Sequence, residues 1–476
     1  MGRGTFFVMI STFVFFLGGY VVQVGLGRYL GPAEYGTFGV VLALMNMVNL
    51  FLTYGFPKSA AKYIAEGKVK TGSIIKMATR VQLIFCTLGF VIYLGLSSVI
   101  ANLLNDPSLT RYIMLSSISI PAYALFAIYS GGYLNGMRRF GRQALVAIAN
   151  SLGKITLVFI FVFIGWGVNG AILGYIGSSL FGLVLAFRFI RPIEKGEDTF
   201  SWKQLLSFGI PATIFAVLFF FLMSIDLYAV KALDAVKADV GYYTAASTIS
   251  KLSYYLFSGL AVTLLPSISK STSTGNVEQT GNYIRRSMRY MILILLPLTL
   301  LISATSSGLT KLIYSSTYID AANPLGILVL GLAFLSIFSV LTSVVMGAGK
   351  PKVAVWMALP LVVMDIILNV ILIPRYGLVG AAWATTSTGF VGMCAAAVYV
   401  YWKFKTLVNA MSALKIVLAS VVIYLIAANV SVSLVWLVPL YLGLAALYGG
   451  LLWGLREIRR DDIEMVKRIV RIGSSK

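Results

Sequence analysis

Long apolar runs constrain this chain more than any other feature of its sequence. Stretches of about 20 hydrophobic residues recur along it, and each is long enough to cross a hydrocarbon core of about 30 Å. Only 11% of the residues are charged, whereas a soluble domain carries about 25%. Inside lipid every backbone polar group needs an internal partner, so runs of this length must be helices. We therefore predict an all-α integral membrane protein.

The runs divide the chain into about fourteen predicted transmembrane helices. The first run is too long for a signal peptide, and no small-residue cleavage site follows it, so we interpret it as a retained span. The approximate limits of the spans are residues 5–26, 36–56, 80–101, 111–133, 144–165, 168–190, 205–230, 242–266, 288–308, 323–346, 353–373, 379–401, 412–430 and 434–454.

The basic residues predict the orientation. Most of the 38 Lys and Arg residues fall on one side of the membrane if the N-terminus is cytoplasmic, as the positive-inside rule requires. We expect a multi-pass protein of the cell (plasma) membrane with both termini cytoplasmic. Topology also accounts for the net charge of +22, so no nucleic-acid partner is expected. Segment 57–79 and the tail 456–471 can form amphipathic helices that lie on the membrane and contact anionic membrane lipids.

Three short sequence matches indicate an internal repeat. Glu34–Phe38 resembles Asp239–Tyr243, Gly167–Ala171 resembles Gly377–Ala381, and Gly136 with Arg139 recurs as Gly347 with Lys350. Six spans per repeat give two parallel halves, with a site expected between them. The predicted parts are an N-lobe over 1–203, a C-lobe over 204–405, two additional spans over 406–455 and a basic cytoplasmic tail over 456–476.

Several motifs, in the same order along the chain, resemble the polysaccharide-biosynthesis (Wzx-type) flippases of the multidrug/oligosaccharidyl-lipid/polysaccharide exporter superfamily. The first-loop stretch Gly27–Gly36 is similar to their signature. The further matches are Asn135-Gly136 through Phe140-Gly141, Phe208–Pro211, Val240–Tyr243 with Ala245-Ala246, and Tyr318 through Pro324-Leu325. The resemblance covers essentially the whole chain.

The resemblance implies a two-lobed bundle with a central cavity that works by alternating access. Such a protein flips a prenyl-(pyro)phosphate-linked glycan from the inner to the outer leaflet. Its partners would be the lipid-linked oligosaccharide and, as a further candidate, glycan-assembly enzymes; a monomer is expected. It would need no cofactor. The absence of His removes the commonest metal ligand, and Cys86 and Cys394 lie in apolar runs where a disulfide is not expected.

Charged residues inside predicted spans are the candidate site residues, because a charge in lipid usually faces a cavity or a partner. Lys251 is one. Ser247, Tyr254 and Ser258 share its helix face by spacing, and an ammonium among hydroxyls suits a phosphate and sugar hydroxyls. A lysine that snorkels to the interface or pairs with Asp226 remains the alternative.

A second set of candidates lies in spans 5, 7 and 11. Lys154, one turn after Asn150, can hold an anionic head group. The repeat places Lys154 near the position equivalent to Asp365, so an ion pair between these two is the alternative. Asp365 with Asn369, and Asp226, can otherwise bind a coupling ion. Arg28 either reaches the cavity mouth or snorkels to cap the first span.

Two other functions were weighed against the flippase. A cation-coupled multidrug exporter would need an acidic cavity, whereas the mid-span charges are two lysines and one aspartate. A membrane glycan polymerase or ligase would need catalytic acids or arginines on large outer loops, but the predicted outer loops are short and carry no nucleophile or metal motif. The chain is therefore not expected to be an enzyme, and a cationic central cavity is predicted.

Overall fold

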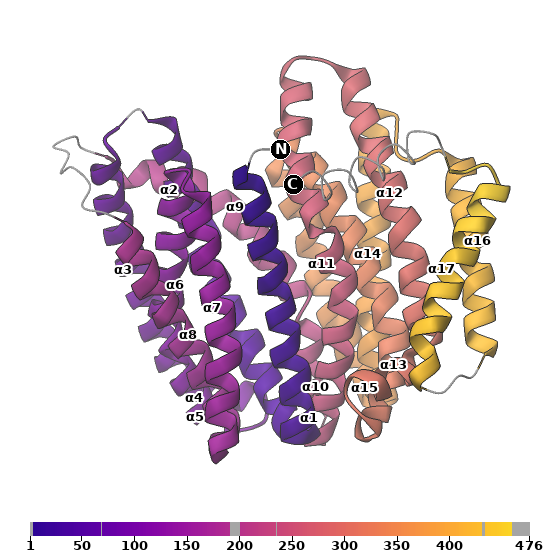
Figure 1. The fold of residues 1–476 in the computed structure, drawn as a ribbon, viewed down its shortest axis with the longest axis horizontal. Coiled ribbons are helices and arrows are strands. Elements are labelled where there is room, and N and C mark those ends of the chain that lie inside the picture. The colour runs from indigo at the N-terminus through magenta and orange to yellow at the C-terminus, as the bar shows by residue number, and fades with distance from the viewer. Residues whose placement is uncertain (1–2, 68, 191–199, 235, 431–433, 459–476) are drawn as a thin grey trace. The chain divides into compact units, whose positions relative to one another are not determined.

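The computed structural model describes residues 3–67, 69–190, 200–234, 236–430 and 434–458. Throughout these residues the regular elements are helices (Figure 1), which confirms the all-α fold class. Most of the predicted tail helix, from residue 459 on, and the side chain of Ser258 lie outside what is described. Two compact units are present: Met1–Thr248 with Pro351–Thr385, called unit 1 below, and Ile249–Lys350 with Thr386–Lys476, called unit 2.

Unit 1 holds the first ten α-helices and two π-helical turns. Apolar runs form these helices, and polar side chains or glycines mark several ends; Ser201, for example, accepts a hydrogen bond from the Lys203 amide at the start of α9. The bounds are α1 Arg3–Thr53, α2 Gly55–Glu66, α3 Thr71–Gly95, α4 Ser97–Leu103, α5 Leu109–Ser117, α6 Ser119–Ala127, η1 Ile128–Leu134, α7 Phe140–Phe161, η2 Val162–Trp166, α8 Gly167–Phe189, α9 Trp202–Leu222 and α10 Ile225–Leu233.

Two long helices, α11 (Lys237–Ser273) and α15 (Pro351–Phe404), run from unit 1 into unit 2. The remaining elements belong to unit 2. Their bounds are α12 Val277–Ala304, α13 Ser306–Ile313, η3 Ser316–Ala321, α14 Ala322–Gly347, α16 Ala410–Asn429, η4 Leu434–Trp436 and α17 Leu437–Gly454.

In the described residues ten helices are long and apolar enough to cross a membrane, or eleven if the bent pair formed by α9 and α10 is one span. Three of them, Ile10–Glu66, Phe140–Phe189 and Pro351–Phe404, have 57, 50 and 54 residues. A straight helix of that length would measure about 75 Å or more, over twice a hydrocarbon core of about 30 Å. Each contains a glycine break, so each has room for two crossings. The exact total of fourteen stays a prediction.

Two of these glycine breaks support the internal repeat. Gly167 has φ 49° and ψ −131°, and Gly377 has φ 55° and ψ −136°. These residues begin the two matching stretches of the sequence, and they adopt the same backbone conformation. Glycine populates this region without a Cβ clash, which is why it recurs at both turns.

Equivalent residues of the two repeats also contact each other within unit 1. A Cβ atom on Gly36 would lie 2.6 Å from the Gly241 amide nitrogen, and one on Gly39 would lie 2.5 Å from Cγ2 of Thr244. In each pair the two residues are 205 positions apart. Such contacts arise where a pseudo-twofold axis passes between two helices, here α1 and α11. They support two pseudo-symmetric halves.

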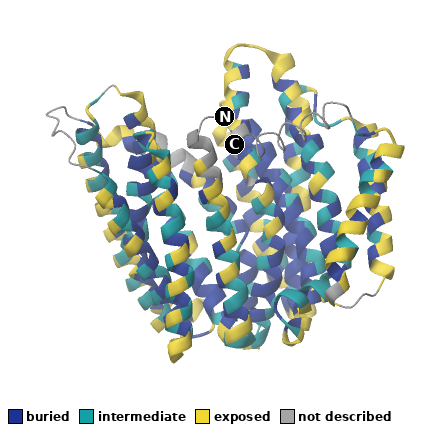
Figure 2. Ribbon diagram, viewed as in Figure 1, coloured by how far each residue is buried: buried dark blue, intermediate teal, exposed yellow. Residues whose placement is uncertain are grey.

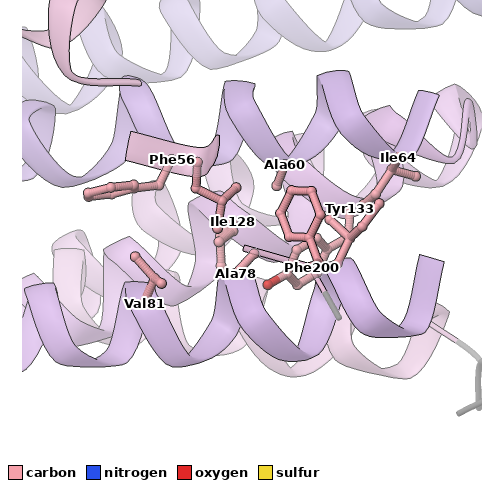
Figure 3. Packing of buried hydrophobic residues seen from close by; sticks show 10 residues of the cluster. Phe56, Ala60, Ile64, Ala78, Val81, Ile128, Tyr133 and Phe200 are labelled. Carbon is pink, nitrogen blue, oxygen red and sulfur yellow. The ribbon is translucent and has the colours of Figure 1, made fainter. Parts of the chain in front are cut away.

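Helix α2 is amphipathic, and its apolar face packs against other helices of unit 1. Its apolar side chains Phe56, Ala60 and Ile64 are buried in a cluster with residues of η1, α3 and the start of α9 (Figure 3). The Ser59 hydroxyl donates to the Leu205 carbonyl at 3.1 Å. Because α3, η1 and the start of α9 cover the apolar face, contact of this segment with anionic lipids would have to involve its other side chains, and it stays a prediction.

Helices α16 and α17 are held onto α12 in unit 2. Leu301 packs with Ile423 and Leu444, and the Tyr448 hydroxyl donates to the Leu293 carbonyl at 2.8 Å. Exposed residues continue along both helices (Figure 2), and only 17% of the most apolar window of α17 is buried. An apolar helix with so much exposed surface fits a position against lipid.

Candidate functional site

Lys154 lies in the middle of α7, and its side chain is buried. Its Nζ atom is 4.7 Å from the ring centroid of Phe15 on α1 and 5.0 Å from that of Tyr175 on α8. Ring faces attract a cation and partly replace its water. Within the described chain no carboxylate lies in ion-pair range of Lys154, so the ion pair with Asp365 weighed from the sequence is not formed.

Asn150, one turn before Lys154, is 1% exposed. Its Nδ2 atom donates to the Ser178 carbonyl at 2.8 Å, which ties α7 to α8. Among the described residues its Oδ1 atom has no hydrogen-bond partner. A buried acceptor left unpaired costs about 1–3 kcal/mol, and it suits a site that receives a donor such as a sugar hydroxyl.

Asp226 lies in the first turn of α10 and is 1% exposed. Its Oδ2 atom accepts hydrogen bonds from the Tyr243 hydroxyl of α11 at 2.7 Å and from the Thr385 hydroxyl of α15 at 3.2 Å. Its Oδ1 atom accepts from the Leu227 amide at 2.8 Å. Three helices therefore converge on one carboxylate, which the sequence did not indicate.

Asp365 and Asn369 are fully buried on α15. The Asn369 amide donates to the Asp365 carbonyl at 2.8 Å, and so to the helix backbone and not to the carboxylate. The Asn369 Oδ1 atom has no hydrogen-bond partner among the described residues. The charges of Asp365 and Asp226 both act on the Tyr243 hydroxyl, so the two carboxylates belong to one polar cluster.

This cluster offers oxygen ligands, the kind that hard cations prefer. The described residues hold no group of three or more His, Cys, Asp or Glu side chains that could bind a metal ion. Two carboxylates with hydroxyl and amide oxygens can accept a proton or bind a cation. Buried intramembrane acids of this kind commonly mark ion pathways.

Of the other predicted residues, all but Ser247 occupy less enclosed positions. Lys251 and Tyr254 lie on α11 and are half-buried, while Ser247, on the same helix, is buried. Tyr254 packs edge-on against Tyr255, with ring centroids 5.5 Å apart. Arg28 is exposed near the end of the first half of α1.

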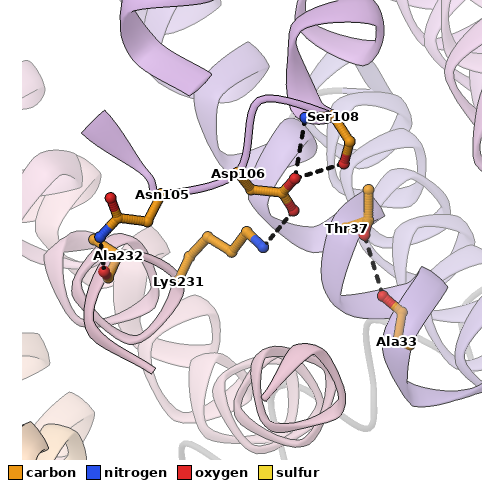
Figure 4. A network of polar contacts seen from close by, with 7 residues as sticks. All are labelled: Ala33, Thr37, Asn105, Asp106, Ser108, Lys231 and Ala232. Atoms are coloured by element: carbon orange, nitrogen blue, oxygen red, sulfur yellow. Dashed lines mark hydrogen bonds and ion pairs between the residues drawn. The ribbon is translucent and has the colours of Figure 1, made fainter. Parts of the chain in front are cut away.

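An ion pair that the sequence did not predict joins the loop after α4 to α10. Lys231 Nζ donates to Asp106 Oδ2 at 2.6 Å, and the side chains are 8% and 9% exposed (Figure 4). Burial raises the pKa of Asp106, but hydrogen bonds from Lys231 and Ser108 and the charge of Lys231 outweigh this effect and lower the pKa overall. The carboxylate therefore stays ionised. Both residues lie in short polar segments of the sequence, where a charged side chain is ordinarily expected to be exposed to solvent.

A family model for polysaccharide biosynthesis proteins matches residues 1–272, more than half of the chain. The chain belongs to the polysaccharide biosynthesis protein family. A second model, named MatE, matches residues 211–371. This membership confirms the family recognised from the motifs in the sequence.

Relatives of known name support the same family. A putative O-antigen transporter from Shigella flexneri is 24% identical over 75% of this chain and 87% of its own length. A probable low-salt glycan biosynthesis flippase, Agl15 from Haloferax volcanii, is 23% identical over 75% of this chain and 74% of its own length. The structure of a lipid II flippase, MurJ, in an inward closed conformation has a TM-score of 0.77, with 19% identity over 93% of this chain and 97% of that one. The two relatives and the solved structure are thus named as a transporter and as flippases.

Proposed function

We propose that this transporter is a lipid-linked oligosaccharide flippase. It moves a prenyl-(pyro)phosphate-linked glycan from the inner to the outer leaflet of the cell membrane by alternating access. Family membership, the named relatives and the MurJ-like fold support this proposal. The observation that carries it is Lys154, a buried cation held by aromatic rings.

The surroundings of Lys154 suit reversible binding of an anion. A cation–π contact contributes about 0.5–2 kcal/mol, and a hydrogen bond between two charged groups is stronger than that of a neutral pair. A phosphate would therefore displace the rings, and the rings would take the ammonium back when the phosphate leaves. Asn150 Oδ1 would accept a hydrogen bond from the glycan. On α11, Lys251 with Ser247 and Tyr254 would supply further contacts to phosphate and hydroxyls.

The polar cluster around Asp226 and Asp365 would bind the coupling ion. With a negative cytoplasm, outward movement of an anionic head group is already favoured by about 2.3 kcal/mol per charge per 100 mV. Inward movement of a cation is favoured by the same potential. Coupling the two would help the protein to release the anion on the outer side, where a cationic site would otherwise retain it.

The division into an N-lobe (1–203), a C-lobe (204–405) and two additional spans (406–455) is part of this proposal, as are cytoplasmic termini and a monomeric state. The cationic central cavity belongs to it as well. The contacts between equivalent residues of the two repeats support two halves of parallel topology.

The proposal is tested with purified protein in proteoliposomes that contain a fluorescent lipid-linked oligosaccharide. Lys154→Ala and Lys251→Ala should each lower the flipping rate, because a hydrogen bond to a charged group contributes about 1.5–3 kcal/mol, or roughly ten- to a hundredfold in rate. Lys154→Arg should keep more activity than Lys154→Ala, because the charge is retained. Full activity of both alanine variants would refute the cationic site.

Ion coupling is tested in the same vesicles with imposed sodium or proton gradients. Asp226→Asn should lower the gradient-driven rate by about 5- to 150-fold, the usual range of coupling between two sites. It should also remove the dependence of the rate on the gradient. Asp320→Asn, at an exposed carboxylate, is the matched control. Unchanged gradient dependence in Asp226→Asn would place the coupling ion elsewhere.

A further inference from the structure

One set of contacts between the two predicted halves lies at the end of unit 1 that is predicted to be outer. Pro32 of α1 lies directly against Gly241 of α11, since a Cβ atom on Gly241 would be 1.9 Å from the Pro32 carbonyl oxygen. At the same end the loop between α4 and α5 touches the last turn of α10. Residues 31–36 and 105–106 come from the first half, and residues 231–232 and 241 come from the second.

The α4–α5 loop is built to present two polar side chains. The Asn105 amide donates to the Asn102 carbonyl, and the Asp106 amide donates to the Ala101 carbonyl, each at 3.0 Å, which closes the end of α4. This turn requires a left-handed residue, and Asn105 supplies it with φ 50°. Ser108 holds Asp106 through its amide at 3.1 Å and its hydroxyl. Contacts within the loop therefore set its geometry independently of α10.

Both presented side chains bind the end of α10. Asn105 Nδ2 donates to the Ala232 carbonyl at 2.7 Å, and Asp106 accepts from Lys231 Nζ at 2.6 Å (Figure 4). The Ala232 carbonyl belongs to the last turn of a helix, where carbonyls lack intrahelical partners. Two adjacent residues of the loop, Asn105 and Asp106, thus bind two adjacent residues of α10, Lys231 and Ala232.

We propose that Asp106–Lys231, with Asn105–Ala232, is a latch that holds the outer ends of the two halves closed and opens in each transport cycle. This inference rests on the flippase proposal for its role in transport. When the latch opens toward water, both charges are rehydrated, which offsets their lost attraction. A buried ion pair can therefore close and reopen. When one partner is removed, the remaining buried charge favours the open state, in which water reaches it.

The opening of the latch is tested by labelling from outside, without any substrate. The background carries Cys86→Ala, Cys394→Ala and a reporter, Thr244→Cys, at a position buried against Gly39. Lys231→Met or Asp106→Asn should raise the rate of modification by a membrane-impermeant maleimide at least about tenfold, since a buried charge without its partner favours the open state. The charge-swapped pair Asp106→Lys with Lys231→Asp should return the rate toward that of the background.

The role of the latch in transport is tested by a reversible cross-link. Asn105→Cys with Ala232→Cys, joined by a short bis-methanethiosulfonate, should lose at least nine-tenths of the flipping rate, or about tenfold, because the bond holds one state. Reduction should restore the rate. The control, Val99→Cys with Leu103→Cys, lies one turn apart on the exposed face of α4, outside the latch, and should flip normally after cross-linking. Full flipping by the cross-linked latch pair, or equal labelling of Lys231→Met and its background, would overturn the latch.

If wild type fails to flip the oligosaccharide, the proposed substrate is wrong, and labelling still decides the latch.

Discussion

Replacing Gly241 with alanine should force the outer end of unit 1 apart. The new Cβ atom would meet the Pro32 carbonyl oxygen at 1.9 Å and the Pro32 carbonyl carbon at 2.5 Å. These are backbone atoms, so no rotamer change relieves the overlap. Overpacking of this kind typically costs about 1–3 kcal/mol, and valine should cost more than alanine. We expect a lower apparent Tm and faster outside labelling of Thr244→Cys.

Gly259→Ala is the matched control for this prediction. Gly259 lies on the same helix, and a Cβ atom there would have no heavy atom within 4 Å. Removing a glycine from a helix interior should stabilise that helix slightly. If Gly241→Ala and Gly259→Ala gave the same Tm and the same labelling rate, the close contact between Pro32 and Gly241 would not exist in the protein.

Replacing Arg289 with alanine should destabilise unit 2 more than any exposed substitution. Arg289 Nε donates to Glu457 Oε1 at 2.8 Å, and its Nη2 donates to the Glu457 carbonyl at 2.7 Å. The side chains are 7% and 4% exposed, and Ser412 donates to the same carboxylate. Loss of the arginine leaves the Glu457 carboxylate buried without its partner, which lowers the free energy of unfolding by about 3–5 kcal/mol. The apparent Tm in detergent, followed by size-exclusion fluorescence, measures this loss.

Two further variants separate the ion pair from general damage. Arg286→Ala, at an exposed position on the same helix, should change stability by no more than about 0.5 kcal/mol. Arg289→Met with Glu457→Leu removes both charges, so it should recover much of the stability lost by Arg289→Ala. Equal Tm values for Arg289→Ala and Arg286→Ala would contradict the prediction.

Helix type and approximate position could be predicted from the sequence, because apolar runs in lipid have few other solutions. Lys154, Asp226 and Asp365 stand out in the sequence because a charge within an apolar run is conspicuous, and all three are buried in the structure. Their partners could not be predicted. Phe15 lies 139 positions from Lys154, and Thr385 lies 159 positions from Asp226. Contacts at such separations depend on how helices pack, which hydropathy does not encode.

The buried ion pairs outside the long apolar runs were missed for a different reason. Asp106 and Glu457 stand beside polar neighbours, so their local sequence resembles a solvated loop. Each is buried because a turn at the end of a helix directs it inward: α4 ends just before Asp106, and α17 ends just before Glu457. A left-handed residue precedes each acid, Asn105 with φ 50° and Arg456 with φ 52°. A search for acids that follow a helix-ending turn would have found both.

The contact of Gly39 with Thr244 bears on how such a chain arises by gene duplication. In a dimer of one ancestral half, a residue at this place would face its own copy. Two threonines would overlap there, because even a single added Cβ on Gly39 would come within 2.5 Å of the Thr244 methyl group. Two glycines would leave a gap. A glycine can face a threonine at this place only if the two halves have different sequences, which becomes possible once they are joined in one polypeptide and diverge. Fusion therefore allowed a closer fit between the halves than the symmetric ancestor could make.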